Sequence, residues 1–144
     1  MAESYNPETV WPPFGAFSMT VLPGTGQVVH LKGQVSLDQT GAVVGAGDMR
    51  QQVDQVLKNI EIVLKGFGGR MSDVISLVHH TTDIQAFMQT GDIRSQFFKP
   101  PYPITTTVEV VSLYHPDLLI EITAVAEIPT ARFIRPTTTQ SMHA

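Results

Sequence analysis

One carboxylate near the end of the chain has mostly apolar neighbours. Residues 118–126 read Leu-Leu-Ile-Glu-Ile-Thr-Ala-Val-Ala, and side chains that alternate at a period of two predict a strand there. Its apolar face carries Leu118, Ile120, Ile122, Ala124 and Ala126. Glu121 lies on the other face between Leu119 and Thr123, where an ionised carboxylate is costly unless it is hydrogen-bonded, paired or open to a cleft. Glu121 is therefore a candidate general acid or base, and the alternative is a solvated or ion-paired carboxylate on an edge strand.

The other reactive residue types form no recognised catalytic motif. The chain has no cysteine, which excludes disulfides, thiolate metal sites and cysteine nucleophiles. His79 and His80 are neighbours in an expected strand, so their rings point to opposite faces and do not make a two-imidazole site. A serine nucleophile elbow, a Walker loop and a His-Glu-x-x-His helix are all missing from the sequence. We therefore predict no metal and no cofactor.

Composition limits the class of protein. The chain has 144 residues, enough for one domain with a proper core, and 15% of them are charged, with a net charge of −4. A chain of this charge lacks the basic surface that sequence-independent nucleic-acid binding requires. The N-terminus has no signal-peptide pattern, and no apolar run approaches the roughly 18 residues of a membrane span. We expect a soluble cytoplasmic protein with neither a nucleic-acid nor a membrane partner.

The first third of the chain is predicted to be mostly β. Residues 1–13 contain three prolines and no periodicity, and we expect an irregular lead-in. Two β-rich runs, 17–22 and 27–31, flank the Pro-Gly-Thr-Gly sequence of residues 23–26, which is typical of a hairpin loop. A further short strand is expected at 33–37, followed by a turn at Asp38 to Gly41.

The rest of the chain alternates helices and strands. Residues 49–67 have an apolar stripe at helical spacing, with Asp48 and Gln51 as a capping pair and Gly68-Gly69 as the stop, and Gln52 is expected to point outward. A strand is predicted at 73–82, a second helix at 83–98, two strands joined by a short connection at 102–128, and an extended or disordered tail at 129–144. The order β-β-(β)-α-β-α-β-β predicts an α+β domain at 14–128, with two helices on one face of a mixed sheet.

Several stretches, taken together and in order, resemble the reactive intermediate deaminase (Rid) family, also called the YjgF or endoribonuclease L-PSP family. They are Phe14 to Val21, Gly33 to Gly41, Gln51 to Leu64, Val74 to Asp83, Phe97-Phe98, Tyr102 to Val110 and Ile120 to Ala126. Residues 115–122 are also similar, more weakly, to the aminomuconate deaminase branch.

The resemblance implies a chorismate-mutase-like fold, a homotrimer with ligand clefts between subunits, and hydrolysis of imines and enamines without a cofactor. In that mechanism an Arg grips the substrate carboxylate and a Glu activates or orients the attacking water. Glu121 occupies the position of that Glu. The implied substrate-binding residues are Phe17, Lys32, Gly33, Phe87, Gly91, Thr105 and Thr107.

The chain departs from the family pattern at the carboxylate-binding position. Thr105 stands where the Arg is usual, and a threonine lacks the bidentate, charge-assisted pairing of a guanidinium. Gly91, Lys32 and Phe17 stand where Asn, Ser and Tyr are common. The site is retuned away from simple 2-imino acids, with Lys32, Arg132 or Arg135 as a relocated cation, or it binds without turnover. The two hypotheses are thus a deaminase-like hydrolase and a trimeric binding or docking module, with RNA cleavage a distant third.

Overall fold

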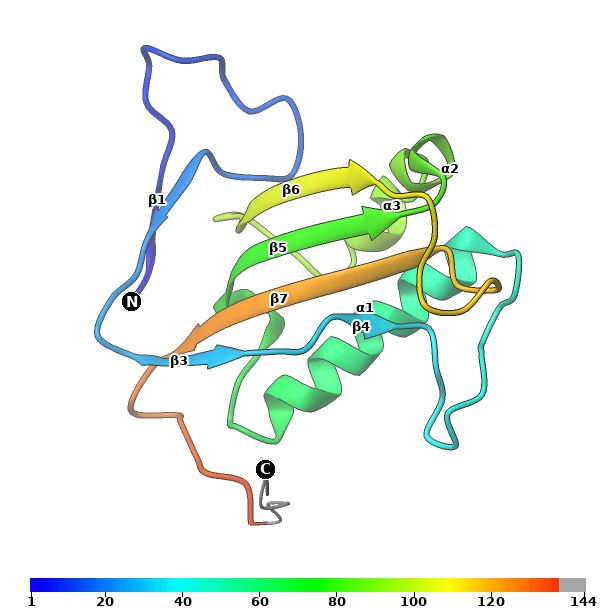
Figure 1. The fold of residues 1–144 in the computed structure, drawn as a ribbon. Helices are drawn as coiled ribbons and strands as arrows, with labels where there is room; N and C mark the ends of the chain where they lie inside the picture. Colours follow the sequence, from blue (N-terminus) through cyan, green and yellow to red (C-terminus); the bar gives the residue numbers. More distant parts are fainter. Residues whose placement is uncertain (138–144) are drawn as a thin grey trace.

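A curved mixed sheet carries most of the domain. The computed structural model describes residues 1–137, and Figure 1 shows the sheet strands β3 (Gln27–His30), β4 (Gln34–Val35), β5 (Val74–Thr81), β6 (Ile104–Glu109) and β7 (Ile120–Ile128). The strand order is β3-β7-β5-β6, and β4 also pairs with β7. Strands β5 and β6 are parallel, and β3, β4 and β5 all run antiparallel to β7.

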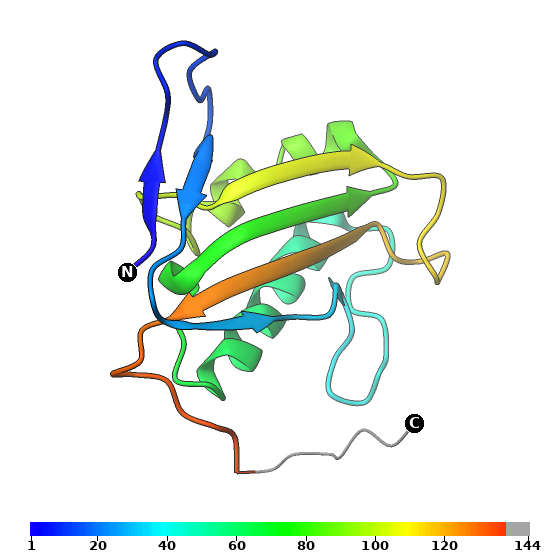
Figure 2. The same cartoon turned by 60° about the vertical axis from the view of Figure 1, so that its left-hand side comes forward.

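The helices lie together on one face of this sheet (Figure 2). They are α1 (Met49–Lys65), a 3-10 turn (Met71–Asp73), α2 (Ile84–Met88) and α3 (Gly91–Arg94). The alternation predicted for β7 is confirmed, since its helix-facing residues Ile120, Ile122, Ala124 and Ala126 are fully buried. They pack against the apolar stripe of α1. Burying each large aliphatic side chain contributes about 1.5–3 kcal/mol, so this contact holds the two layers together.

Helix α1 begins and ends at the predicted signals. The Asp48 carboxylate accepts from the Gln51 backbone N–H, and Gly68, with φ of +75°, lets the Gly69 N–H return to the Leu64 carbonyl. The outward orientation expected for Gln52 is wrong. Its side chain is fully buried because it donates to the carbonyls of Gly45 and Asp117 and accepts from the Leu119 N–H.

The single helix predicted for residues 83–98 is instead two short helices. Asp83 caps α2 as expected, by accepting from the Ala86 N–H, but the helix ends at Met88 and α3 begins at Gly91. The buried Thr90 marks the break, because its hydroxyl donates to the Phe87 carbonyl at 2.6 Å. This side-chain bond competes with continued helical pairing.

The N-terminal segment is more regular than expected. Strand β1 (Glu3–Tyr5) lies within residues 1–13 and pairs antiparallel with β2 (Thr20–Leu22), as a two-stranded sheet of its own. The predicted hairpin at residues 23–26 is therefore wrong, because β2 and β3 belong to different sheets. Strand periodicity predicted β2 and β3 but carried no information about which strands they pair with.

The last two strands are not neighbours either. Strand β5 lies between β6 and β7, so the connection at residues 110–119 crosses the end of β5. After β7 the chain packs back onto the domain. Arg132 donates to both carboxylate oxygens of Asp73 and to the Gly68 carbonyl, and the bonds with Asp73 raise the pKa of Arg132. The remainder of the predicted tail, residues 138–144, lies outside the described residues. No helix in the described part has the length and apolarity needed to cross a bilayer.

Candidate functional site

Glu121 borders a large open hollow. It sits on β7 opposite Val35 of β4 and His80 of β5. Its carboxylate lies directly against Gly33, where an added Cβ would be 2.6 Å from Glu121 Oε2. Within residues 1–137 the carboxylate has no hydrogen bond and no ion pair. The hollow has a volume of about 1010 Å³ and is bordered by Lys32, Gly33, Gln55, Asn59, Ile62, Tyr114 and Glu121.

Polar contacts from α1 and a tight turn shape this hollow. Asn59 donates to the carbonyls of Val35 and Leu37 at 3.3 and 3.0 Å, which ties the segment after Gly33 to the helix. The Asp38 carboxylate accepts from the hydroxyl and N–H of Thr40 and from the Ala42 N–H, and these hydrogen bonds lower the pKa of Asp38. Asp38 is thus committed to the turn, which leaves Glu121 as the free carboxylate of the hollow.

A second group of predicted residues lies elsewhere. Thr105 and Thr107 of β6 align with Leu77 and His79 of β5, so they point to the helix-covered face. Glu121 aligns with His80 and points to the opposite face. Within one chain the structure therefore brings Lys32 and Gly33 to Glu121 but does not bring Thr105 or Thr107 there. The predicted site residues therefore form two groups on opposite faces of the sheet, which we call half-sites. One contains Glu121, Lys32 and Gly33, and the other, at β6, contains Thr105 and Thr107.

The half-site at β6 is built around a buried imidazole. His79 is 2% exposed, and its Nδ1 is 2.9 Å from the Thr107 hydroxyl. Its ring centroid is 4.7 Å from that of Phe87, and the Arg94 guanidinium lies 4.5 Å from the centroid of the Phe87 ring. Burial, then the positive charge of Arg94 and the neighbouring His80, lower the pKa of His79 to about 3. His79 is therefore neutral at pH 7.

The structure also places the remaining predicted residues. Phe87 is fully buried and its ring lies under the Arg94 guanidinium, so its contact with substrate stays a prediction. Gly91 is exposed at the start of α3. Phe17 packs edge-on against Phe14, with ring centroids 5.2 Å apart. The Ser18 N–H and hydroxyl bond the carbonyls of Pro103 and Tyr102, which brings this aromatic segment to the start of β6.

The relocated cations proposed from the tail are not supported within one chain. Arg132 is committed to Asp73, and Arg135 lies over the Phe133 ring at 5.9 Å. Sequence reasoning did not single out Arg94, which borders a small recess with Thr105. A signal was present, because Arg94 is seven positions after Phe87 and so falls on the buried stripe of the expected helix. No group of three His, Asp or Glu side chains suited to a metal occurs in residues 1–137.

Comparison with known proteins decides the family. A family model described as endoribonuclease L-PSP matches residues 9–128. The chain belongs to this family, which is also known as Rid or YjgF. It is 30% identical to the 3-aminoacrylate deaminase RutC of Acinetobacter baylyi, over 85% of this chain and 94% of RutC.

Two further relatives agree with this assignment. The 2-iminobutanoate/2-iminopropanoate deaminase of Homo sapiens is 29% identical over 78% of this chain and 80% of its own length. The crystal structure of YyfB, a Rid family protein of unknown function from Yersinia pestis, superposes with a TM-score of 0.75 at 31% identity, over 88% of this chain and 98% of YyfB. The α+β fold with its mixed sheet is therefore the Rid/YjgF fold, and the Acinetobacter baylyi and Homo sapiens relatives are named deaminases.

Proposed function

We propose that this Rid family protein hydrolyses the C=N bond of a small imine, or of an enamine through its imine, with Glu121 as general base. The observation that carries the proposal is the unpaired Glu121 carboxylate, set against the Gly33 backbone at the edge of an open hollow. Deaminase names among relatives at 29–30% identity support the same chemistry.

The reaction follows from the position of this carboxylate. Glu121 takes a proton from a water whose oxygen bonds to the imine carbon, while the C=N π electrons move to nitrogen. Glu121 passes this proton to the nitrogen, which gives a neutral carbinolamine. Glu121 then moves the hydroxyl proton to the same nitrogen, the C–N bond breaks, and ammonia leaves as the oxygen forms the ketone C=O, so that Glu121 is ionised again. An enamine first gains a proton on carbon to become the imine. Water and substrate are the only reactants.

We further propose that the cleft lies between subunits of a homotrimer. Support comes from the two half-sites, which point to opposite faces of one sheet. The helices cover only one of those faces (Figure 2). The other face carries apolar residues that remain exposed, including Val28 at 41% and Val108 at 39%. A second copy placed on this face would bury them and could bring a β6 half-site to Glu121.

The second candidate function is a trimeric module that binds a small metabolite or docks on a partner without turnover. Thr105 is the observation that favours it, because the strand position that would hold a substrate carboxylate has no charge. The two candidates differ in whether ammonia is released.

Glu121→Gln tests the proposal, because it keeps the shape of the side chain and removes its basicity. Ammonia release from freshly generated 2-imino acids and from 2-aminomuconate-like enamines should fall about 100-fold or more, while Glu61→Gln on the exposed face of α1 should change nothing. Unchanged turnover in Glu121→Gln would remove Glu121 from the mechanism. Thermal stabilisation by these compounds without ammonia release by the parent protein would favour the binding module.

A further inference from the structure

Arg94 differs from Arg50 and Arg132 in lacking an acidic partner within residues 1–137. Arg50 pairs with Asp92 and Arg132 pairs with Asp73. Within the part of the chain that the structure describes, the Arg94 guanidinium has no carboxylate partner. Its contacts are the face of the Phe87 ring at 4.5 Å and one hydrogen bond, from Nε to the Thr90 hydroxyl at 3.3 Å. Both terminal nitrogens are left without a hydrogen-bond acceptor among residues 1–137.

This environment leaves Arg94 with unsatisfied charge. Partial burial removes water from the guanidinium and lowers the pKa of Arg94, although an arginine stays charged at pH 7. His79 borders the same recess as Arg94 and is neutral at pH 7, so it adds no charge there. A guanidinium stacked on an aromatic face keeps its in-plane N–H groups free, and these match the two oxygens of a carboxylate.

The free edge of Arg94 is next to the position where the family pattern places its own arginine. Arg94 and Thr105 border the same recess, together with Ala16, His79 and Phe98. The recess measures about 20 Å³, which accommodates about one water-sized atom and hence one carboxylate oxygen. Gly91 does not crowd the guanidinium, because even a Cβ added there would be 4.0 Å from Arg94 Nη2.

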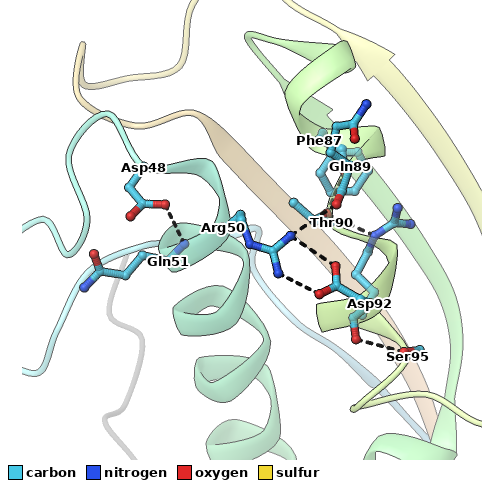
Figure 3. Close-up of polar contacts among 9 residues, drawn as sticks. Asp48, Arg50, Gln51, Phe87, Gln89, Thr90, Asp92 and Ser95 are labelled. Atoms are coloured by element: carbon cyan, nitrogen blue, oxygen red, sulfur yellow. Dashed lines mark hydrogen bonds and ion pairs between the residues drawn. The ribbon is translucent and has the colours of Figure 1, made fainter.

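Surface contacts hold α3, and with it Arg94, in a defined place. Figure 3 shows Arg50 of α1 reaching across to Asp92 of α3, with Nη1 to Oδ1 at 3.1 Å and Nη2 to Oδ2 at 2.6 Å. Arg50 Nη1 also donates to the Gln89 carbonyl at 3.3 Å. The bidentate pair takes up the Asp92 carboxylate on the α1 side, so this acid is not free to neutralise Arg94.

From these contacts we infer that Arg94 is the substrate-anion residue of this protein, binding the carboxylate of a carboxylated imine or enamine beside Thr105. The inference rests on the proposed function for the identity of the reacting group, since the anion subsite alone does not specify it. It returns carboxylated compounds to the substrate range, with the carboxylate held from helix α3 instead of strand β6.

Binding of 2-oxo acids tests the inference without requiring turnover. Pyruvate and 2-oxobutanoate carry the carboxylate, and pyruvamide is a neutral counterpart. We expect the parent protein to bind pyruvate at least about tenfold more tightly than pyruvamide, and Arg94→Met to abolish that preference. Arg135→Met is the matched control, because it also removes an arginine that lies over a phenylalanine ring. It should keep the preference, as should Arg94→Lys in part.

A double variant makes the test independent of folding defects. Adding Thr105→Arg to Arg94→Met places a guanidinium on the neighbouring strand and should restore tighter binding of pyruvate than of pyruvamide. The inference is overturned if the parent protein shows no preference for the anion, if Arg94→Met retains it with an unchanged melting temperature, or if the double variant folds and fails to regain it.

The same measurements separate this inference from the proposed function. Glu121→Gln should lose ammonia release and keep pyruvate binding, because Glu121 acts on water and not on the carboxylate. If pyruvate binding depends on Arg94 but the protein deaminates none of the compounds, the deaminase proposal is contradicted and the anion subsite is supported. Turnover of an imine that does not depend on Arg94 would support the deaminase proposal and contradict the anion subsite.

Discussion

The two half-sites of this chain differ in charge, in their surroundings and in the volume next to them. At Glu121 a carboxylate lies beside a glycine and borders an open hollow of about 1010 Å³. At Arg94 a cation is packed on an aromatic ring, beside a neutral histidine and a recess of about 20 Å³. The first has space for a substrate and a water, and the second has space for one atom of an anionic group.

Under the two proposals above, this difference separates catalysis at Glu121 from anion binding at Arg94. A general base needs room for the water it activates, whereas an anion-binding residue gains from a fixed, partly dehydrated position. Because the two half-sites face opposite sides of one sheet, each chain would contribute its base to one cleft and its cation to another.

The largest expected effect comes from placing a methyl group at each half-site in turn. Gly33→Ala would put its Cβ 2.6 Å from Glu121 Oε2, and the flexible carboxylate must move away. We expect turnover to fall about 100-fold with little change in melting temperature, because displacement of a catalytic group by about 1 Å is costly for rate. The matched variant Gly91→Ala meets only Arg94 Nη2, at 4.0 Å, and should retain turnover. Equal losses in the two variants would contradict the comparison.

The next effect concerns pH and the buried histidine. The folded pKa of His79 is about 3, against an ordinary value near 6.5. Between these values the unfolded chain binds a proton that the folded chain does not, so stability falls as the pH drops below about 6.5 and the loss levels off below about 3. The expected loss between pH 8 and pH 5 is about 2 kcal/mol.

Denaturant unfolding of the parent protein and of His79→Gln at both pH values measures this contribution as a difference in slope. An NMR titration that places the His79 pKa near 6.5 would show that water reaches the β6 half-site. The contrast between a partly dehydrated half-site there and an open one at Glu121 would then be lost.

The smallest effect comes from the hydroxyl that holds His79. Thr107→Val removes the partner of Nδ1 and should lower the free energy of unfolding by about 1 kcal/mol. Thr123→Val is the matched control, because Thr123 lies on the uncovered face of β7 beside Glu121 and makes no side-chain hydrogen bond within residues 1–137. A larger cost at Thr123 than at Thr107 would show that the uncovered face is the more tightly organised one.

Several parts of the fold were predictable because they depend on local chemistry. The stripe of α1, its Asp48 cap, its Gly68 terminator and the alternation along β7 are set by neighbouring residues, and all are confirmed. The same alternation placed Glu121 on the face opposite the core. The partner of β2 and the burial of Gln52 depend on contacts between segments up to 67 positions apart, which no local pattern encodes.

The candidate site was likewise predictable only where it depends on local patterns. The sequence by itself determined the family, the two-layer class of fold and the candidate base, because these follow from periodicity and from motifs read in order. Only the tertiary structure decided that Arg94 lies beside Thr105, since α3 and β6 meet through packing on the shared core. The sequence shows that Thr105 stands where an arginine is usual, and the fold brings Arg94 of α3 to the same recess.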